Sequence, residues 1–370
     1  MSQHDDDAEL VREPARRYLD AAASPEHLKE LLEQPGGFDS TIWAGAVELG
    51  WPAAALPERH GGLELGWRAL CVLAEELGRK AVSLPLIGSA AVAQLLLDSG
   101  NEQALRHLPA LASGEQHACL ALCQPDCSGL AVQPRMSWWN GKLSGRTAVT
   151  PFGASAAFAL VPARADGALV LLLVSLDQPG AMRQVAPSID NSRAAAALHF
   201  DGASAIVLGD AAAAEARLWQ TASLAALATA FEQVGGAQSS LELARDYALE
   251  RKAFGQPIGR FQAIKSKLAD IYIRIELARG CALDALAALE SGDERWPSLA
   301  AAARVAAIDA YDVAARETIQ THGAIGVTWE AMPHHHYRRA RALALELGAG
   351  LAWRERLLAT AVFENLANHE

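Results

Sequence analysis

Uninterrupted helical periodicity dominates the second half of the chain. Residues 215–251 carry apolar side chains three and four positions apart and contain no proline, so the sequence predicts one long helix there. The same periodicity recurs at 261–292, 298–323 and 351–366. Long helices with alanine-rich faces, joined by short turns, favour a helical bundle.

The periodicity changes twice along the chain. Residues 1–116 show helical spacing with glycines at the stops, whereas short apolar stretches separated by Asn, Gly, Asp and Pro turns begin near residue 117. Helical spacing returns near residue 213. We therefore predict an α+β fold with an N-terminal helical domain (1–116), a middle β domain (117–212) and a C-terminal helical bundle (213–370).

Composition argues against several classes of protein. The net charge is −11 and no cluster of Lys and Arg stands out, so we expect no nucleic-acid partner. The apolar run at 168–176 has the length of a buried strand, which is too short to span a membrane. The N-terminus is acidic and does not resemble a signal peptide. A cytoplasmic protein with no membrane partner is the expectation.

Two clusters of metal-ligating residue types invite a metal hypothesis. Cys119, Cys123 and Cys127 recur every four residues, but no spaced His or Cys pair completes a ligand set. The run 334–336 consists of three consecutive histidines, whose side chains point apart and rarely share one ion. We predict reduced thiols, a structural or surface role for the histidines, and no metal.

The turn between the first two long helices has the composition of an anion site. Arg251 offers a planar fork of donors that fits phosphate oxygens, and Phe254 supplies an aromatic wall. Gly255 and Gly259 allow the backbone to approach a ligand closely. This combination suits a dinucleotide pyrophosphate. The alternative is a solvated helix end with a packed Phe.

Three segments, in order, resemble the acyl-CoA dehydrogenase family: ELGWPAAALPERHGGLELGWRALCVLAEELGR (48–79), RKAFGQPIGRFQAIK (251–265) and QTHGAIGVTWEAMPHHHYRRAR (320–341). The resemblance implies N-terminal helices, a middle β-barrel-like domain and a C-terminal four-helix bundle that oligomerises. It also implies FAD-dependent α,β-dehydrogenation of an acyl-CoA substrate, with electron-transfer flavoprotein as acceptor. In that reaction a carboxylate removes the α-proton while a hydride passes to the flavin.

Neither family position for the catalytic base carries a carboxylate here. One position lies twenty-six residues before the signature arginine and falls on Ala225; the other follows the RRA segment and falls on Leu347. Glu346 is adjacent, but one residue of slip turns a helical side chain by about 100°, and we expect it to face solvent. Glu232 lies two turns after Ala225 in an apolar stretch. It is either a base or a buried structural Glu paired with an Arg of a neighbouring helix.

The residues that the family uses for the adenosine-diphosphate (ADP) end of FAD are retained. In homo-oligomeric members the signature segments of one subunit hold the ADP end of the flavin bound by its neighbour. The matching residues here are Arg251, Phe254, Gln262, Gln320 and Gly323.

The residues that would hold the flavin ring are not retained. Cys123 and Gln124 stand where the family has Thr and Glu, and the facing strand carries Ala-Val-Thr-Pro at 148–151, with Thr150 kept and the covering aromatic lost. Trp138 and Trp139 are expected to precede a turn and cover the sheet. This pattern resembles the non-catalytic subunit of heteromeric (α2β2) acyl-CoA dehydrogenases of steroid side-chain degradation, which completes the FAD site of a homologous catalytic subunit.

Two other functions remain open from the sequence. The first is a self-sufficient homo-oligomeric enzyme that uses Glu232 as its base. The second is a flavin-free binding or scaffold protein on the same fold.

Overall fold

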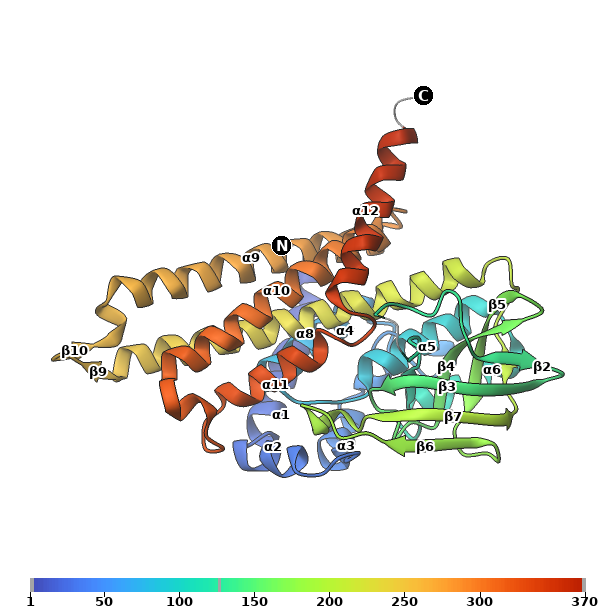
Figure 1. The fold of residues 1–370 in the computed structure, drawn as a ribbon, viewed down its shortest axis with the longest axis horizontal. Helices are drawn as coiled ribbons and strands as arrows, with labels where there is room; N and C mark the ends of the chain where they lie inside the picture. Colours follow the sequence, from blue (N-terminus) through green and yellow to red (C-terminus); the bar gives the residue numbers. More distant parts are fainter. Residues whose placement is uncertain (1–2, 126–127, 368–370) are drawn as a thin grey trace.

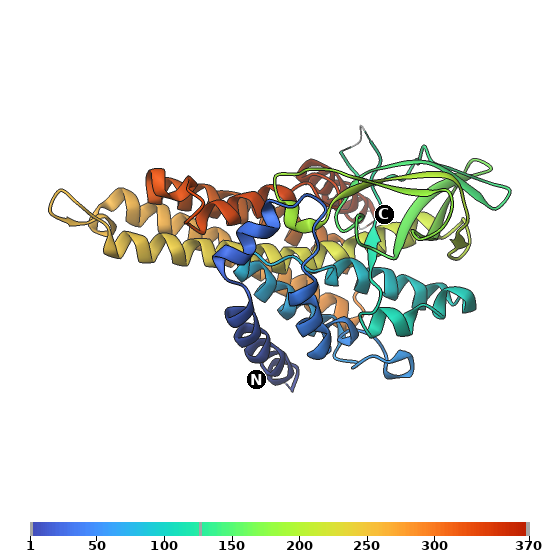
Figure 2. The ribbon, with the colours of Figure 1, turned by 90° about the horizontal axis from the view of Figure 1, so that it is seen from below.

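The computed structural model describes residues 3–125 and 128–367, so Cys127 lies outside the described residues. Helices flank a curled sheet, which lies at one end of the elongated molecule (Figures 1 and 2). The longest helix, α8 (Ala214–Glu250), runs from beside this sheet to the opposite end. This arrangement confirms the predicted α+β architecture.

The N-terminal region is helical, as predicted. Asp39 caps one of its helices by accepting a hydrogen bond from the Ile42 N–H at 3.0 Å, and Gly100 ends another in the left-handed conformation. The helices are α1 (Gln3–Ala22), α2 (Pro25–Leu32), α3 (Ser40–Glu48), α4 (Gly66–Lys80), α5 (Leu86–Ser99), α6 (Glu102–Leu105) and α7 (Leu108–Ala112), with 3-10 turns η1 (Trp51–Ala53) and η2 (Glu58–His60).

The middle region forms a mostly antiparallel sheet in the order β6-β7-β3-β2-β4-β5-β8, with β1 added parallel to β4. Trp138 and Trp139 pair with Leu143 and Lys142 across a tight turn, as expected for residues that precede a hairpin. The strands are β1 (Ala118–Leu120), β2 (Ser137–Trp139), β3 (Lys142–Thr150), β4 (Phe158–Ala165), β5 (Ala168–Ser175), β6 (Ala181–Val185), β7 (Ala196–Ala203) and β8 (Ile206–Val207). The 3-10 turn η3 (Asn191–Arg193) connects β6 and β7.

The four helical stretches predicted in the second half all form. Helices α8, α9 (Gln262–Ser291) and α10 (Trp296–His322) pack side by side, and α12 (Gly350–Ala367) packs against α10 while projecting from the body (Figure 1). The 3-10 turn η5 (Gly323–Val327) leads to a shorter helix, α11 (Pro333–Leu343), which lies along α8 and α10. Within the described residues, no helix combines the length and apolar content needed to cross a membrane.

Candidate functional site

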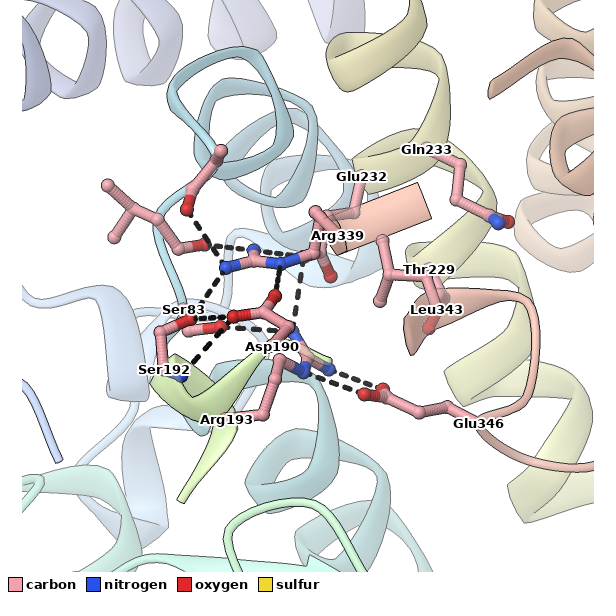
Figure 3. Close-up of polar contacts among 12 residues, drawn as sticks. Ser83, Asp190, Ser192, Arg193, Thr229, Glu232, Gln233, Arg339, Leu343 and Glu346 are labelled. Carbon is pink, nitrogen blue, oxygen red and sulfur yellow. Dashed lines mark hydrogen bonds and ion pairs between the residues drawn. The ribbon is translucent and has the colours of Figure 1, made fainter. Parts of the chain in front are cut away.

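Five charged side chains meet where the sheet, α4, α8 and α11 come together (Figure 3). Asp190 and Arg193 come from the segment around η3, Glu232 from α8, Arg339 from α11, and Glu346 from the loop that follows α11. Glu346 as a whole residue is half-buried, and the other four residues are buried. We call this group the ionic cluster.

Arg193 bridges two carboxylates of the ionic cluster. Its Nε donates to Glu346 Oε1 at 2.7 Å and its Nη2 donates to the other oxygen of the same carboxylate, while Nη1 donates to Glu232 Oε1 at 3.2 Å. The guanidinium also lies over the Phe152 ring, 5.1 Å from its centroid. Burial alone would lower the pKa of Arg193, but Glu346 and Glu232 raise it above its ordinary value.

Arg339 joins the ionic cluster to the end of α4. Its Nε donates to Asp190 Oδ2 at 2.5 Å and its Nη1 donates to Glu232 Oε1 at 3.1 Å. The same guanidinium donates to the carbonyls of Val82 and Ala81, at 2.8 and 2.9 Å, which satisfies backbone groups just beyond the helix. Against the opposing effect of burial, Asp190 and Glu232 raise the pKa of Arg339.

A fully buried arginine of α10 fixes the loop after α11. Arg304 donates to the backbone carbonyls of Leu343 and Glu346, the latter at 2.9 Å, and to Gln233 Oε1 at 2.6 Å. In the part of the chain that the structure describes, Arg304 forms no ion pair with a carboxylate, and burial lowers its pKa to about 10 although Glu346 and Glu232 act in the opposite direction. Arg304 therefore holds the backbone that presents Glu346 and Leu347.

Both positions predicted for a catalytic base line one small cavity of about 50 Å³, which we call the inner cavity. Ala225 contributes from α8 and Leu347 from the loop after α11, so two positions far apart in sequence converge on one space. Neither side chain can accept a proton. Glu232 and Glu346 also line this cavity.

The expectation that Glu346 faces solvent is wrong. Its side chain is only 13% exposed because the loop folds back onto the η3 segment, where Arg193 binds the carboxylate at both oxygens. Burial raises the pKa of Glu346, although Arg193 acts in the opposite direction. Glu232 forms ion pairs with Arg339 of the neighbouring helix α11 and with Arg193 of the segment beside the sheet, as a buried structural Glu would.

A larger cleft of about 700 Å³, the outer cleft, lies between the sheet and the loop after α11. Its walls include the residues predicted to have lost the flavin-ring function, namely Cys123 and the segment 148–151 without its covering aromatic. The Thr150 hydroxyl is already engaged, because it donates to the Ala148 carbonyl at 3.1 Å. Gln124 does not line the cleft and instead bonds Gln133 and Arg135 backbone groups.

The signature segment forms a hairpin at the end of the molecule far from the sheet (Figure 1). Strands β9 (Lys252–Ala253) and β10 (Gln256–Pro257) pair around a turn in which both Phe254 and Gly255 have positive φ, 51° and 80°. A positive φ is unusual for a bulky residue and is typical of a two-residue hairpin turn. Phe254 is 96% exposed, and Arg251 and Gln262 are also exposed.

The second predicted segment lies at the same end of the bundle. Tyr247 on the last part of α8 stacks on His322 at the end of α10, with ring centroids 4.3 Å apart. Gly323 follows directly, with φ 65° and ψ −141°, a combination open essentially to glycine alone. The contact places Gln320 and Gly323 near the signature hairpin.

The sequence did not indicate that other side chains enclose Gln320 in a pocket. A cavity of about 480 Å³ is lined by Gln320 together with Trp329, His334 and Arg338. Arg338 lies over the Trp329 ring at 5.1 Å, and His334 meets the same ring edge-on. Trp329 and Arg338 are nine residues apart, a spacing that matches neither one face of a helix nor one face of a strand, so the sequence did not indicate this pocket.

The three consecutive histidines are all buried, so the surface role is wrong and the structural role stays a prediction. His336 Nδ1 shares a hydrogen bond with the Tyr311 hydroxyl (2.9 Å), and its Nε2 shares one with Ser239 Oγ (3.2 Å). Burial lowers its pKa to about 3. Among the described residues, no group of three His, Cys, Asp or Glu side chains is arranged to hold a metal ion.

Comparison with solved structures defines the class of protein. A variant of the Tcur3481-Tcur3483 steroid ACAD superposes with a TM-score of 0.90 at 29% identity, covering 99% of this chain and 100% of that one. The ChsE4-ChsE5 complex from Mycobacterium tuberculosis gives 0.87 at 23% identity over 98% of each chain, which supports the fold alone. The fold is that of flavin-dependent acyl-thioester dehydrogenases.

Sequence comparison then identifies the family. Residues 5–115 match the N-terminal domain of acyl-CoA dehydrogenases, and residues 217–357 match the C-terminal domain. Acyl-CoA dehydrogenase IpdE2 of Mycobacterium tuberculosis is 30% identical over 340 residues, which cover 92% of each protein. The chain belongs to the acyl-CoA dehydrogenase family.

Proposed function

We propose that this chain is the non-catalytic subunit of a heteromeric, flavin-dependent acyl-CoA dehydrogenase. It would complete the ADP half of the FAD site of a homologous catalytic subunit through Arg251, Phe254, Gln262, Gln320 and Gly323. The variant of the Tcur3481-Tcur3483 steroid ACAD, which is named as a pair, supports an assembly of this type and a bulky steroid side-chain acyl-CoA as the substrate class. Electron-transfer flavoprotein is the proposed electron acceptor.

The position of the signature hairpin carries this proposal. The hairpin lies at one end of the molecule, away from the sheet (Figure 1), and Arg251 and Phe254 are exposed there. The outer cleft is instead lined by residues of the sheet and of the loop after α11. One flavin could not contact both the signature hairpin and the outer cleft of the same chain, because the two lie toward opposite ends of the molecule. Residues that are preserved yet remote from the chain's own cleft are expected if they serve a cofactor bound by another subunit.

FAD fits the groups that the hairpin offers. A guanidinium complements pyrophosphate charge, and the exposed Phe254 ring, edge-on to Phe261 at 6.2 Å, offers an unused aromatic face. FAD supplies the hydride acceptor of the reaction when bound. In the inner cavity, Ala225 and Leu347 carry no carboxylate, and the carboxylates of Glu232 and Glu346 are both paired with Arg193. We therefore assign the proton-abstracting base to the partner subunit.

An apolar face is available for the proposed partner. Tyr272, Ile273, Leu277 and Leu283 of α9 are between 45% and 64% exposed. Contiguous exposed apolar side chains on one helix mark interaction surfaces. The face lies on the helix that begins after the signature hairpin and η4 (Ile258–Arg260), so docking through α9 would bring the partner to the same side of the bundle end as the hairpin.

Flavin content tests the proposal. The chain is purified alone and co-purified with a homologous dehydrogenase that carries Glu at the position of Ala225 or Leu347. We expect the lone chain to be colourless and the complex to be yellow and active. A lone chain that holds a full complement of FAD and bleaches with acyl-CoA would indicate the self-sufficient enzyme, and a complex without flavin would indicate a scaffold.

Variants then locate the contribution of this chain. Replacing Arg251 with Ala removes a charge-assisted hydrogen-bond donor, so FAD binding by the complex should weaken by about 1.5–3 kcal/mol, roughly 10- to 100-fold. Arg17→Ala, an exposed arginine of α1, is the matched control and should leave the flavin content unchanged. Equal flavin retention in the two variants contradicts the role of Arg251.

A further inference from the structure

We propose that the Arg193–Glu346 ion pair is an internal partition that seals an apolar compartment behind the outer cleft. While the pair is in place, it restricts the access of aliphatic ligands to the compartment. The inference concerns the interior of this chain and does not depend on a flavin or on a partner subunit.

The two spaces meet at this ion pair. The inner cavity and the outer cleft have five lining residues in common: Leu120, Pro151, Arg193, Glu346 and Leu347. Within the described part of the chain, Arg193 and Glu346 are the only charged residues that line both spaces. Glu232 lines the inner cavity and does not line the outer cleft, so Arg193 stands between that carboxylate and the cleft.

The partition is rigid because both of its members are fixed from more than one side. Arg193 makes two hydrogen bonds to Glu346, a third to Glu232, and its own carbonyl accepts from the Phe152 N–H at 2.7 Å. The Glu346 backbone is held by Arg304 at 2.9 Å. Bidentate pairs of this kind have narrow geometric tolerance, so small side-chain motions do not open a passage.

The space behind the partition suits a hydrocarbon. Apart from Glu232, Thr229 and the partition itself, its lining is apolar and includes Leu77, Leu84, Ile87 and Phe152. At about 50 Å³ the cavity is small for an alkyl chain. Removing the long side chains of Arg193 and Glu346 would join it to the 700 Å³ of the outer cleft. The occupant of the enlarged space would be an aliphatic or alicyclic chain.

A charge-balanced double variant tests the partition. Arg193→Ala with Glu346→Ala removes one charge of each sign and leaves Glu232 paired with Arg339. Arg193→Met with Glu346→Leu removes the same charges but keeps apolar bulk in the passage. The probe is decan-1-ol, titrated calorimetrically into the full chain, because it is neutral and lacks the CoA group.

We expect the alanine pair to bind decan-1-ol at least about tenfold more tightly than the wild type, with the Met/Leu pair close to the wild type. Circular dichroism and cooperative unfolding establish that each variant is folded. If the folded alanine pair binds no better than the Met/Leu pair, or if the wild type already binds as tightly, the partition does not exist.

Thiol labelling gives a second readout that does not rely on ligand affinity. Cys119 lines the inner cavity and is buried, which raises its pKa to about 12, whereas Cys123 lines the outer cleft. With a small maleimide and peptide mass spectrometry, Cys119 labelling should rise at least about tenfold in the alanine pair and stay low in the Met/Leu pair. Labelling of Cys119 in the wild type at the rate of the alanine pair overturns the proposal.

Discussion

Gly78 of α4 lies directly against the backbone carbonyl of Glu232 on α8. A β-carbon added to Gly78 would sit 1.8 Å from that carbonyl oxygen, so the two helices touch at main-chain atoms. The contact is reciprocal, because a β-carbon on Gly235 of α8 would lie 2.0 Å from the Glu75 carbonyl oxygen. Glycine at both positions therefore fixes how α4 and α8 cross, and with it the place of Glu232 in the ionic cluster.

Replacing Gly78 with Ala should destabilise the chain. The neighbour is backbone and cannot rotate away, so the helices must separate, which costs about 1–3 kcal/mol in a packed core. Urea unfolding followed by circular dichroism measures the change. An unchanged free energy of unfolding would mean that α4 and α8 are not in close contact.

Gly280 is the matched control, with the opposite expected sign. It lies in the interior of α9 and a β-carbon there would meet nothing within 4 Å. Ala is the better helix former, so Gly280→Ala should stabilise the chain by about 0.5–1 kcal/mol. Gly→Ala thus tests helix–helix packing at Gly78 and helix propensity at Gly280.

Glu232 is predicted to stabilise the folded chain. Glu232→Ala leaves Arg193 and Arg339 without the carboxylate oxygen that they share, so unfolding should become easier by about 3–5 kcal/mol. Glu242→Ala, on the same helix but bonded only to Gln238 in the described contacts, should change stability by less than about 0.5 kcal/mol. The measurement is denaturant unfolding of the lone chain. Equal effects of the two substitutions would show that the ionic cluster contributes little.

Much of the fold could be predicted because its signals are local. The long helices follow from apolar spacing, over 215–251 without proline, and a turn after the first of them follows from Gly255, Pro257 and Gly259. The β-hairpin that turns at Phe254 and Gly255 was not predicted. Family resemblance located the two base positions, and the structure brings Ala225 and Leu347 to one cavity.

The ionic cluster could not be predicted because its members are distant in sequence. Arg193 and Glu346 are 153 residues apart, and nothing in the ALELG context of Glu346 indicates a buried arginine partner. Isolated charges in loops are usually solvated. The environment of Glu346 was therefore mispredicted, while that of Glu232, in a visibly apolar helix, was among the alternatives considered.

Acid should destabilise the chain through its buried histidines. Burial lowers the pKa of His336 to about 3 and those of His335 and His117 to about 4, from 6.5. The unfolded chain therefore binds more protons than the folded chain between these values and 6.5, so stability is lost as pH falls below about 6.5. Each such histidine contributes a slope approaching about 1.4 kcal/mol per pH unit.

His336→Gln isolates one of these contributions. Gln cannot take up the proton, so the free energy of unfolding of the variant should fall less steeply between pH 6 and 5 than that of the wild type, by about 1.4 kcal/mol per unit. His60→Gln, a half-buried histidine outside the cluster of three, is the control. Unfolding curves across this range measure both slopes, and parallel slopes for His336→Gln and the wild type contradict the assignment.

The apolar face of α9 is predicted to hold the assembly together. Leu277 is 64% exposed in the single chain and sits among exposed apolar neighbours. Leu277→Lys would place an unpaired charge in the proposed interface, so association should weaken by at least about 2 kcal/mol, roughly 30-fold. Leu358→Lys makes the same change at a leucine of α12 that is also 64% exposed, and should leave association unchanged. Sedimentation equilibrium measures both variants. Dissociation by Leu358→Lys with an intact Leu277→Lys assembly would move the interface from α9 to α12.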